Sequence, residues 1–139
     1  MRQDFTTIDV ETRQPGLVEI TGRVLAWLEG TGIDEGIVTV FIRHTSASLL
    51  IQENADPDVC SDLDAFLRRL VPEDSRLYRH TAEGDDDMPA HIRAALTATQ
   101  LSIPLVAGEL RLGTWQGIYV FEHRRGRFRR SVDLHVIGE

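Results

Sequence analysis

The sequence predicts an α+β fold with a mostly antiparallel sheet, a β-sandwich-like core and about three helices. Strand-like segments occur in clusters, and helical patterns separate the clusters instead of following every strand, which disfavours a wound parallel sheet. The last third of the chain consists of strand and turn patterns. A length of 139 residues suits one domain with one core. We therefore expect a single domain over residues 1–139.

The first part of the chain predicts an edge strand, a helix and two further strands. Residues 4–10 alternate weakly, as an edge strand does. Apolar residues from Leu17 to Leu28 recur at helical spacing, and Gly30 and Gly32 follow as a stop. The run Ile37–Ile42 is β-branched and apolar throughout, which is typical of a strand buried on both faces. A further strand is expected at about Ser48–Gln52.

Two more helices are expected in the middle of the chain. Asp56 and Pro57 form a cap and first-turn pair, after which apolar residues mark one helix face until Pro72. Residues 73–87 are rich in acidic side chains and predict a long loop. Asp87 as cap and Pro89 in the first turn start the third helix. The residues expected to face the core from this helix are Met88, Ile92, Ala95, Leu96 and Thr99.

Strands and turns are expected to complete the chain as a meander. Leu101–Val106 is interrupted by Pro104, which favours an edge or bulged strand. Ala107 and Gly108 predict a turn. The remaining expected strands are Leu110–Leu112, Ile118–Glu122 and Phe128–Ile137, the last with alternating Val132, Leu134 and Val136.

Composition excludes several classes of function. A net charge of -7 argues against general nucleic-acid binding. All fifteen basic residues are arginine, so neither a lysine Schiff base nor a Walker-type phosphate loop is available. No apolar run approaches the ~18 residues of a membrane span, and the start does not resemble a signal peptide. The lone Cys60 agrees with a reducing compartment, so we expect a cytoplasmic protein.

Three histidines, His44, His80 and His91, lie in or beside segments of polar and small residues. If their rings converge on one divalent ion, three protein ligands leave a position for water or substrate, as in catalytic zinc sites. Separations of 36 and 11 residues match no short metal motif, so separate surface or capping histidines are an equal alternative. His123 and His135 are expected to be structural.

Carboxylates and arginines accompany these histidines. Four of the carboxylates could orient a ligand, serve as general base or hold magnesium, although most of the acidic loop is expected to be merely solvated. The four are Glu53, Glu83, Asp86 and Asp87. Five arginines between Arg124 and Arg130 suit phosphate, or form a solvated hairpin tip. The turn Gly113–Gly117 either shapes a pocket wall or packs its tryptophan on the core.

Several motifs, in order, resemble the YjbQ family. These motifs are His44 to Leu49 (HTSASL), Glu53 to Pro57 (ENADP), Glu83-Gly84, Asp86 to Pro89 (DDMP), His91-Ile92, Gly113 to Ile118 (GTWQGI), Glu122 to Arg124 (EHR) and the closing Gly138-Glu139. The resemblance runs from about residue 36 to the last residue. It is specific because so many short motifs follow one another in the same order.

The resemblance implies a compact α+β subunit that assembles as a homotrimer, with clefts near the subunit contacts. It also implies a metal-associated cluster of His44, His80 and His91, with zinc favoured. Members look like secondary thiamine-phosphate synthases, which join a pyrimidine diphosphate to a thiazole phosphate and release pyrophosphate. The substrate-binding residues then expected are Ser46, Asn54, Asp86, Thr114, Trp115, Gln116 and Arg124, and the expected catalytic residues are Glu53 and Asp87.

Three hypotheses for function follow. A synthase would hold magnesium and diphosphate with Glu53, Asp86 and Asp87, while Arg124 steadies phosphate. A hydrolase would use the histidine-bound metal to lower the pKa of water, with Glu53 or Asp87 taking the proton. A non-enzymatic trimer would bind a phosphorylated ligand. None of the three predicts a nucleic-acid or membrane partner.

Overall fold

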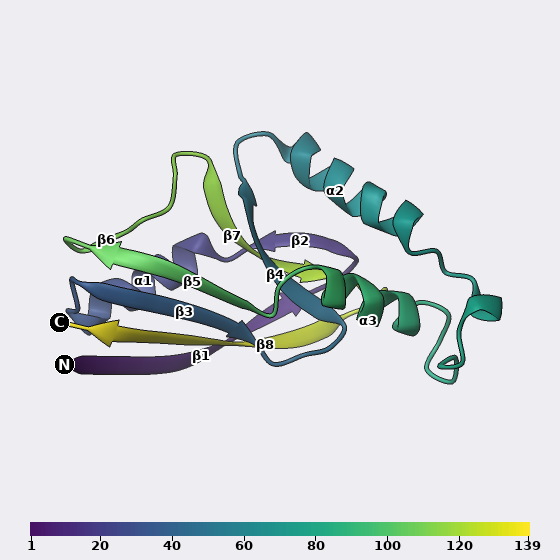
Figure 1. The fold of residues 1–139 in the computed structure, drawn as a ribbon, viewed down its shortest axis with the longest axis horizontal. Coiled ribbons are helices and arrows are strands. Elements are labelled where there is room, and N and C mark those ends of the chain that lie inside the picture. The colour runs from purple at the N-terminus through teal and green to yellow at the C-terminus, as the bar shows by residue number, and fades with distance from the viewer.

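Two antiparallel sheets and three α-helices make up the protein, as the computed structural model of residues 1–139 shows (Figure 1). The larger sheet has the order β1-β8-β3-β5-β6 and the smaller one the order β2-β7-β4. This confirms the α+β prediction. The strands are β1 (Arg2–Thr12), β2 (Gly16–Glu19), β3 (Gly36–Ile42), β4 (Ala47–Glu53), β5 (Gln100–Val106), β6 (Glu109–Leu110), β7 (Gln116–Glu122) and β8 (Phe128–Gly138). The helices are α1 (Thr21–Thr31), α2 (Pro57–Leu70) and α3 (Asp87–Leu96), with a 3-10 turn at Ser75–Leu77.

The core lies between the concave faces of the two sheets. Strand β8 supplies Val132, Leu134 and Val136, all fully buried, because side chains two residues apart project to the same face. They belong to a cluster of 17 buried apolar residues from both sheets and α1. Strand β8 pairs with β1 along its whole length and with β3. This long strand therefore carries the sheet toward α3.

The prediction that Ile37–Ile42 is buried on both faces was wrong. Val38, Val40 and Ile42 are buried, whereas Ile37 and Phe41 are 49% and 40% exposed. The larger sheet has its core on one side only, so alternate residues of β3 face outward. An unbroken apolar run therefore does not distinguish a strand that is buried on both faces from a strand that is buried on one face only.

The helix expected from Leu17 begins later, at Thr21. Leu17 and Val18 instead belong to β2 and pair with Phe121 and Val120 of β7. The spacing of these side chains fits either a helix or a strand. Residues 16–19 form a strand because β7 offers them a free edge for pairing. Gly32 ends the helix in the left-handed conformation, with φ of 68°, as its position after the apolar stripe predicts.

Helices α2 and α3 lie on one side of the molecule. Asp56 caps α2 by accepting a hydrogen bond from the Asp58 amide at 2.9 Å, and Pro57 occupies its first position, as predicted. None of the residues of α2 is buried, and the helix runs along the outside of the smaller sheet (Figure 1). Helix α3 packs on β4. None of the helices has the length and apolar character needed to cross a bilayer.

The face of α3 was predicted wrongly. Asp87, Pro89, Ala90, Arg93 and Ala94 are its buried residues, whereas the expected core residue Leu96 is 57% exposed. Asp86 occupies the N-cap position, and Asp87 is the first helical residue, so Asp87 is not the cap. Polar side chains on the inner face of a short helix are unusual, and they point to a role other than packing.

The last strands do not form a meander. Strand β7 lies in the smaller sheet between β2 and β4, and β8 crosses to the larger sheet between β1 and β3. Strand β5 has only the two-residue β6 beyond it, which agrees with the effect expected of Pro104. The switch of sheets between β7 and β8 places the turn after Glu122 beside the start of α3 (Figure 1).

Candidate metal centre

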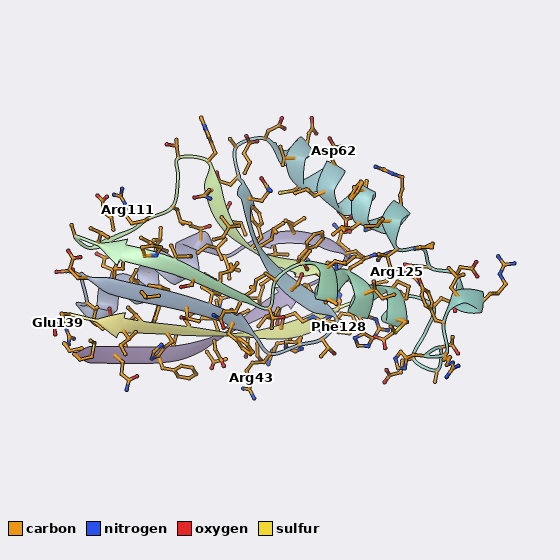
Figure 2. All side chains as sticks on the ribbon, in the orientation of Figure 1. Arg43, Asp62, Arg111, Arg125, Phe128 and Glu139 are labelled. Carbon is orange, nitrogen blue, oxygen red and sulfur yellow. The ribbon has the colours of Figure 1, made fainter.

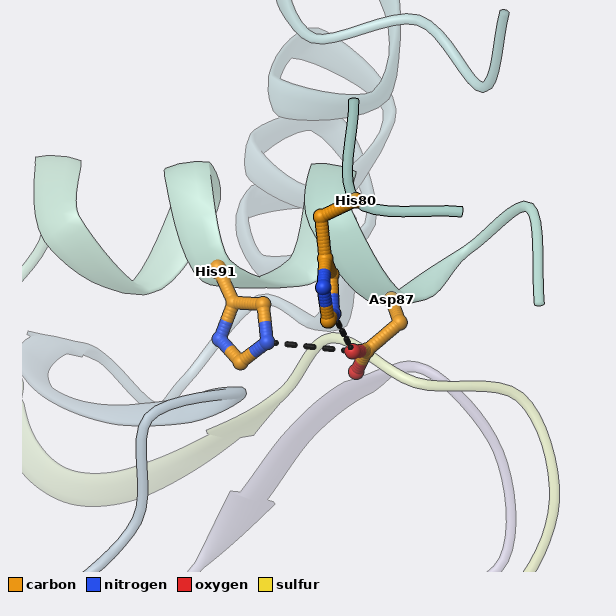
Figure 3. A group of neighbouring side chains, drawn as sticks. All are labelled: His80, Asp87 and His91. Carbon is orange, nitrogen blue, oxygen red and sulfur yellow. Dashed lines mark hydrogen bonds and ion pairs between the residues drawn. The ribbon is translucent and has the colours of Figure 1, made fainter. Parts of the chain in front are cut away.

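His80, Asp87 and His91 form a compact group at the start of α3 (Figure 3). Their ligand atoms all lie within 4.8 Å of one another. Asp87 and His91 are four residues apart and therefore share one helix face, while His80 comes from the preceding loop. Both Nε2 atoms point at Oδ2 of Asp87, at 2.6 Å from His80 and 3.1 Å from His91.

The orientation of His91 leaves a donor atom free for a cation. Its Nδ1 lies 2.9 Å from the carbonyl oxygen of Thr45, and because a carbonyl only accepts, Nδ1 must carry a hydrogen. In the neutral ring Nε2 then has a lone pair, and this lone pair faces a carboxylate oxygen of Asp87. Two acceptors in this arrangement require a proton on Nε2 or a cation bound nearby.

His80 is the exposed member of the group. A hydrogen bond to Asp87 is the main reason why the pKa of His80 is raised, and the charges of Asp87 and Glu83 act in the same direction. Oε2 of Glu83 lies 3.3 Å from Nε2 of His80, and the Glu83 side chain is 66% exposed. A flexible carboxylate therefore stands at the open side of the group.

Arg124 holds the buried carboxylates in place. Its Nη1 donates to Oδ1 of Asp87 at 2.8 Å, and its Nε donates to Oδ2 of Asp86 at 3.2 Å. Burial alone would raise the pKa of both carboxyl groups, but hydrogen bonds from Arg124 to Asp86 and from His80 to Asp87 lower both pKa values overall. Both aspartates are therefore ionised at neutral pH, and Oδ2 of Asp87 faces the histidines.

His44 is not part of this group in the chain. Its Nε2 accepts a hydrogen bond from the Ser131 amide at 2.8 Å, so that nitrogen is not directed at His80 or His91. Burial, and then the charge of Arg130, lower the pKa of His44, which keeps the ring neutral at pH 7. His44 and His91 nevertheless line one cavity of about 280 Å³, together with Thr45, Ala94, Ala95 and Thr99. The expected set of three imidazoles is thus replaced by two imidazoles and a carboxylate.

A buried ion pair lies behind His44 and was not predicted from the sequence. Nη2 and Nε of Arg130 donate to the carboxylate of Glu122, and Nη2 also donates to Oγ of Ser46 at 3.1 Å. The side chains of Arg130 and Glu122 are 5% and 0% exposed. A signal was present, because Arg130 is in phase with the inward-facing Val132 and Leu134. Ser46 thus supports the arginine here.

Five other predicted site residues gather at the opposite end of the β4–β7 pair. Glu53 pairs with Gln116 at one end of these strands, and Ala47 pairs with Glu122 at the other. Seven-residue strands span roughly 20 Å, so the two ends are far apart within one chain. Trp115 is 60% exposed, so the expected alternative in which it packs on the core was wrong. The residues at this end are Glu53, Asn54, Thr114, Trp115 and Gln116.

The arginine-rich segment is largely occupied by carboxylates. Arg124 binds Asp86 and Asp87, Arg125 pairs with Glu73, and Arg130 pairs with Glu122. Arg125 and Phe128 lie near the start of α3, whereas Arg111 lies toward the other end of the molecule (Figure 2). The segment therefore serves first to connect the β7–β8 turn to α3.

The residues present fit a divalent cation. Two imidazole nitrogens and one carboxylate oxygen form a donor set that suits zinc and similar borderline metals, with at least one coordination position left for another ligand. The hydrogen bond from His91 to a backbone carbonyl is the usual support of a metal-bound histidine. The contact between two acceptors, Nε2 of His91 and Oδ2 of Asp87, is the observation that favours this fit.

Comparison with known proteins shows matches over nearly the whole chain. A family model described as UPF0047 protein YjbQ-like matches residues 6–139. A UPF0047 protein from Synechocystis is 52% identical, with 99% of this chain and 94% of that protein covered, and YjbQ from Escherichia coli O157:H7 is 38% identical, with 96% of each covered. The crystal structure of a conserved hypothetical protein from Thermus thermophilus is 36% identical, with a TM-score of 0.84 and 95% and 99% coverage.

Proposed function

We propose that this chain, which belongs to the YjbQ (UPF0047) family, is a metal-dependent enzyme. Its site would be the His80–Asp87–His91 group, and it would act there on a phosphorylated small molecule. The observation that carries the proposal is the convergence of two Nε2 atoms on one buried carboxylate oxygen, with His91 oriented by the Thr45 carbonyl. Zinc is the cation that this donor set favours.

The residues at and around the group would have separate roles in the reaction. A bound cation would supply Lewis acidity to an oxygen of the substrate or to water. Asp87 would bind it through Oδ2, while Arg124 keeps the carboxylate ionised and oriented. Glu83, exposed and next to His80, is placed to accept a proton at the open side. Glu53, which the sequence suggested as general base, lies at the other end of β4 and would need to come from a second copy.

Thiamine-phosphate synthesis remains the first specific reaction to test. It would release pyrophosphate, which magnesium normally accompanies. The carboxylates expected to hold magnesium are not all free, because both oxygens of Asp86 accept hydrogen bonds from Arg124. This observation favours the alternative, hydrolysis of a phosphorylated metabolite that uses only the histidine-bound cation. A non-enzymatic ligand-binding protein would show ligand binding without turnover.

We also propose a homotrimer, in which a neighbouring copy brings the Glu53–Trp115 end of the β4–β7 pair toward the His80–Asp87–His91 group. Two features support this assembly. Trp115 is exposed although it is large and aromatic, and α2 has no buried residue although Phe66 and Leu70 project from it at 53% and 56% exposure. Large exposed apolar side chains gathered on a surface are typical of contact sites.

Metal content is the decisive measurement. Elemental analysis of the protein purified without chelators should find about one zinc-like ion per chain. The metal content of the His91→Ala and Asp87→Asn variants should be lower by about tenfold or more. His44→Ala should keep the ion, because His44 is outside the group, and His135→Ala on β8 is a matched histidine control. A wild-type protein that neither contains nor takes up a stoichiometric ion would contradict the proposal.

Assays of the same variants then separate the reactions. Pyrophosphate release from hydroxymethylpyrimidine diphosphate and thiazole phosphate tests the synthase, and phosphate release from a panel of phosphorylated metabolites tests the hydrolase. For the hydrolase, His91→Ala should abolish turnover. Turnover that survives in His91→Ala but is lost without magnesium or in Asp86→Asn would instead support the synthase. Equal activity of all variants would remove both.

A further inference from the structure

We infer that His44 binds an anionic oxygen of the substrate through its Nδ1–H, in the cavity that it shares with His91. The inference deepens the proposed function, since it assumes that this cavity holds the substrate. It assigns His44 to the substrate and not to the cation, and it makes the substrate a molecule with a phosphate or carboxylate oxygen within reach of the His80–Asp87–His91 group.

The neutral ring of His44 carries its hydrogen on Nδ1. The amide of Ser131 is a donor only, and it lies 2.8 Å from Nε2 of His44. Nε2 must therefore carry the lone pair, and in a neutral ring the hydrogen must be on Nδ1. This assignment depends on a backbone amide of β8, which cannot rotate to offer another atom.

Nδ1 of His44 lies next to a second donor. Nη1 of Arg130 lies 3.4 Å from Nδ1 of His44, and a guanidinium nitrogen is also a donor only. Two N–H groups thus face each other, and Nη1 has no other hydrogen-bond partner, because Glu122 and Ser46 bind only Nε and Nη2. Arg130 is 4% exposed, so this is an unpaired donor of a buried charged side chain.

A single acceptor atom would satisfy both donors. An acceptor atom about 2.8 Å from each of two nitrogens 3.4 Å apart is compatible with ordinary hydrogen-bond geometry. An anionic oxygen is preferred, because hydrogen bonds to charged acceptors in partly buried sites are the stronger ones. His44 lines the cavity and Arg130 does not, so the oxygen would approach the two nitrogens from the side of His44.

The position relative to the cation site gives the substrate class. His91 lines the same cavity from α3, and its Nε2 belongs to the His80–Asp87–His91 group. The cavity thus has His91, a ligand of the proposed cation, on one side and the Nδ1–H donor of His44 on the other. A phosphate or carboxylate bound by His44 would have its neighbouring atoms next to the cation, which is the arrangement needed to act on a phosphorylated or carboxylated small molecule.

The test uses the metal-loaded protein with inorganic phosphate and acetate as probes. Calorimetric titration should show that one of the two anions binds wild type, and that its Kd is weaker by about tenfold or more in His44→Phe, which keeps a ring without donors. His44→Asn, whose amide can donate from the position of Nδ1, should recover most of the affinity. The anion that shows this dependence identifies phosphate or carboxylate as the source of the oxygen.

A second measurement uses the wild-type protein alone, so it does not depend on whether a variant folds. Long-range 1H–15N correlation spectra of wild type should show His44 as the Nδ1–H tautomer, with that proton shifting when the bound anion is added. Equal affinity of wild type and His44→Phe for both anions, or a His44 that carries its hydrogen on Nε2, would overturn the inference. If the proposed function holds, the metal content of His44→Phe stays at the wild-type level. Failure of the proposed metal site can therefore be told apart from failure of the anion-binding role of His44.

Discussion

His123 shows how a single buried side chain links this fold to pH. The ring is 1% exposed, its Nε2 lies 2.9 Å from Oγ of Ser48, and its Nδ1 is buried without a partner. Burial, followed by the charges of Arg93 and Arg130, lowers its pKa to about 3. The folded protein therefore keeps His123 neutral, whereas the unfolded chain takes up a proton below the ordinary histidine pKa near 6.5.

The first prediction concerns acid stability. Because the unfolded state binds the extra proton, stability from His123 is complete above pH 6.5 and is lost as pH falls toward 3. Between pH 6.5 and 4.5 the loss should be on the order of 2 kcal/mol. Urea unfolding of wild type and His123→Phe across this range measures it. Wild type should lose stability relative to the variant steadily as pH falls, and parallel profiles would contradict the assignment.

At the residue scale, part of the candidate site could be predicted from sequence and part could not. Asp87 and His91 are four residues apart in a helix whose start Pro89 indicates, so their shared face was predictable, and His80 lies in the loop just before them. The state of His44 depends on Ser131 and Arg130, more than eighty residues away. No local pattern contains that pairing, so the sequence suggested a third metal ligand instead.

At the scale of elements, the pairing of β3 with β8 depends on glycine at its end. Gly36 has φ of +155°, and a Cβ atom there would overlap the carbonyl oxygen of Ile137 on β8. Gly138 meets the backbone of Glu35 in the same way. Close backbone contact at the end of the two strands thus excludes any side chain.

The second prediction compares two glycine substitutions. Gly36→Ala should destabilise the protein by roughly 3 kcal/mol or more, because both the conformation and the space are unsuitable. Gly30→Ala in α1 has no atom within 4 Å of the added Cβ and should stabilise by up to about 1 kcal/mol, since alanine favours a helix. Thermal unfolding of both variants checks the expected opposite signs. A Gly36→Ala protein with wild-type stability would refute the strain argument.

Elements were predictable where one signal dominated. Asp56 and Pro57 fixed the start of α2, and alternation fixed β8. Leu17 fitted helix and strand equally, and its pairing with Phe121 of β7 selects the strand, whereas Ile20 lies at the N-cap of α1. The face of α3 was missed because its inner side carries Asp87 and Arg93, which bind partners on other elements. Contacts with polar partners that are distant in sequence therefore determined which face of the helix is buried, and the apolar pattern did not.

At the scale of the whole molecule, the exposed face of α2 and the Trp115 turn lead to the third prediction. Light scattering should give about 47 kDa for wild type, three chains of 15.7 kDa. A Phe66→Ser/Leu70→Ser double variant should dissociate with little change in its fold, because neither residue is buried within the chain. Phe5→Ser on β1 has a similarly exposed ring (58%) and should remain assembled. A wild-type mass of one chain would exclude the proposed trimer.

The bonds of Arg124 have a consequence for protein engineering. One side chain joins the turn after β7 to the Glu83 carbonyl and to both aspartates at the start of α3. Changing the length of this turn would displace the ionic contacts that hold the start of a helix on a different part of the backbone. A chimera with a protein that lacks this arginine must exchange Asp86, Asp87 and the turn together.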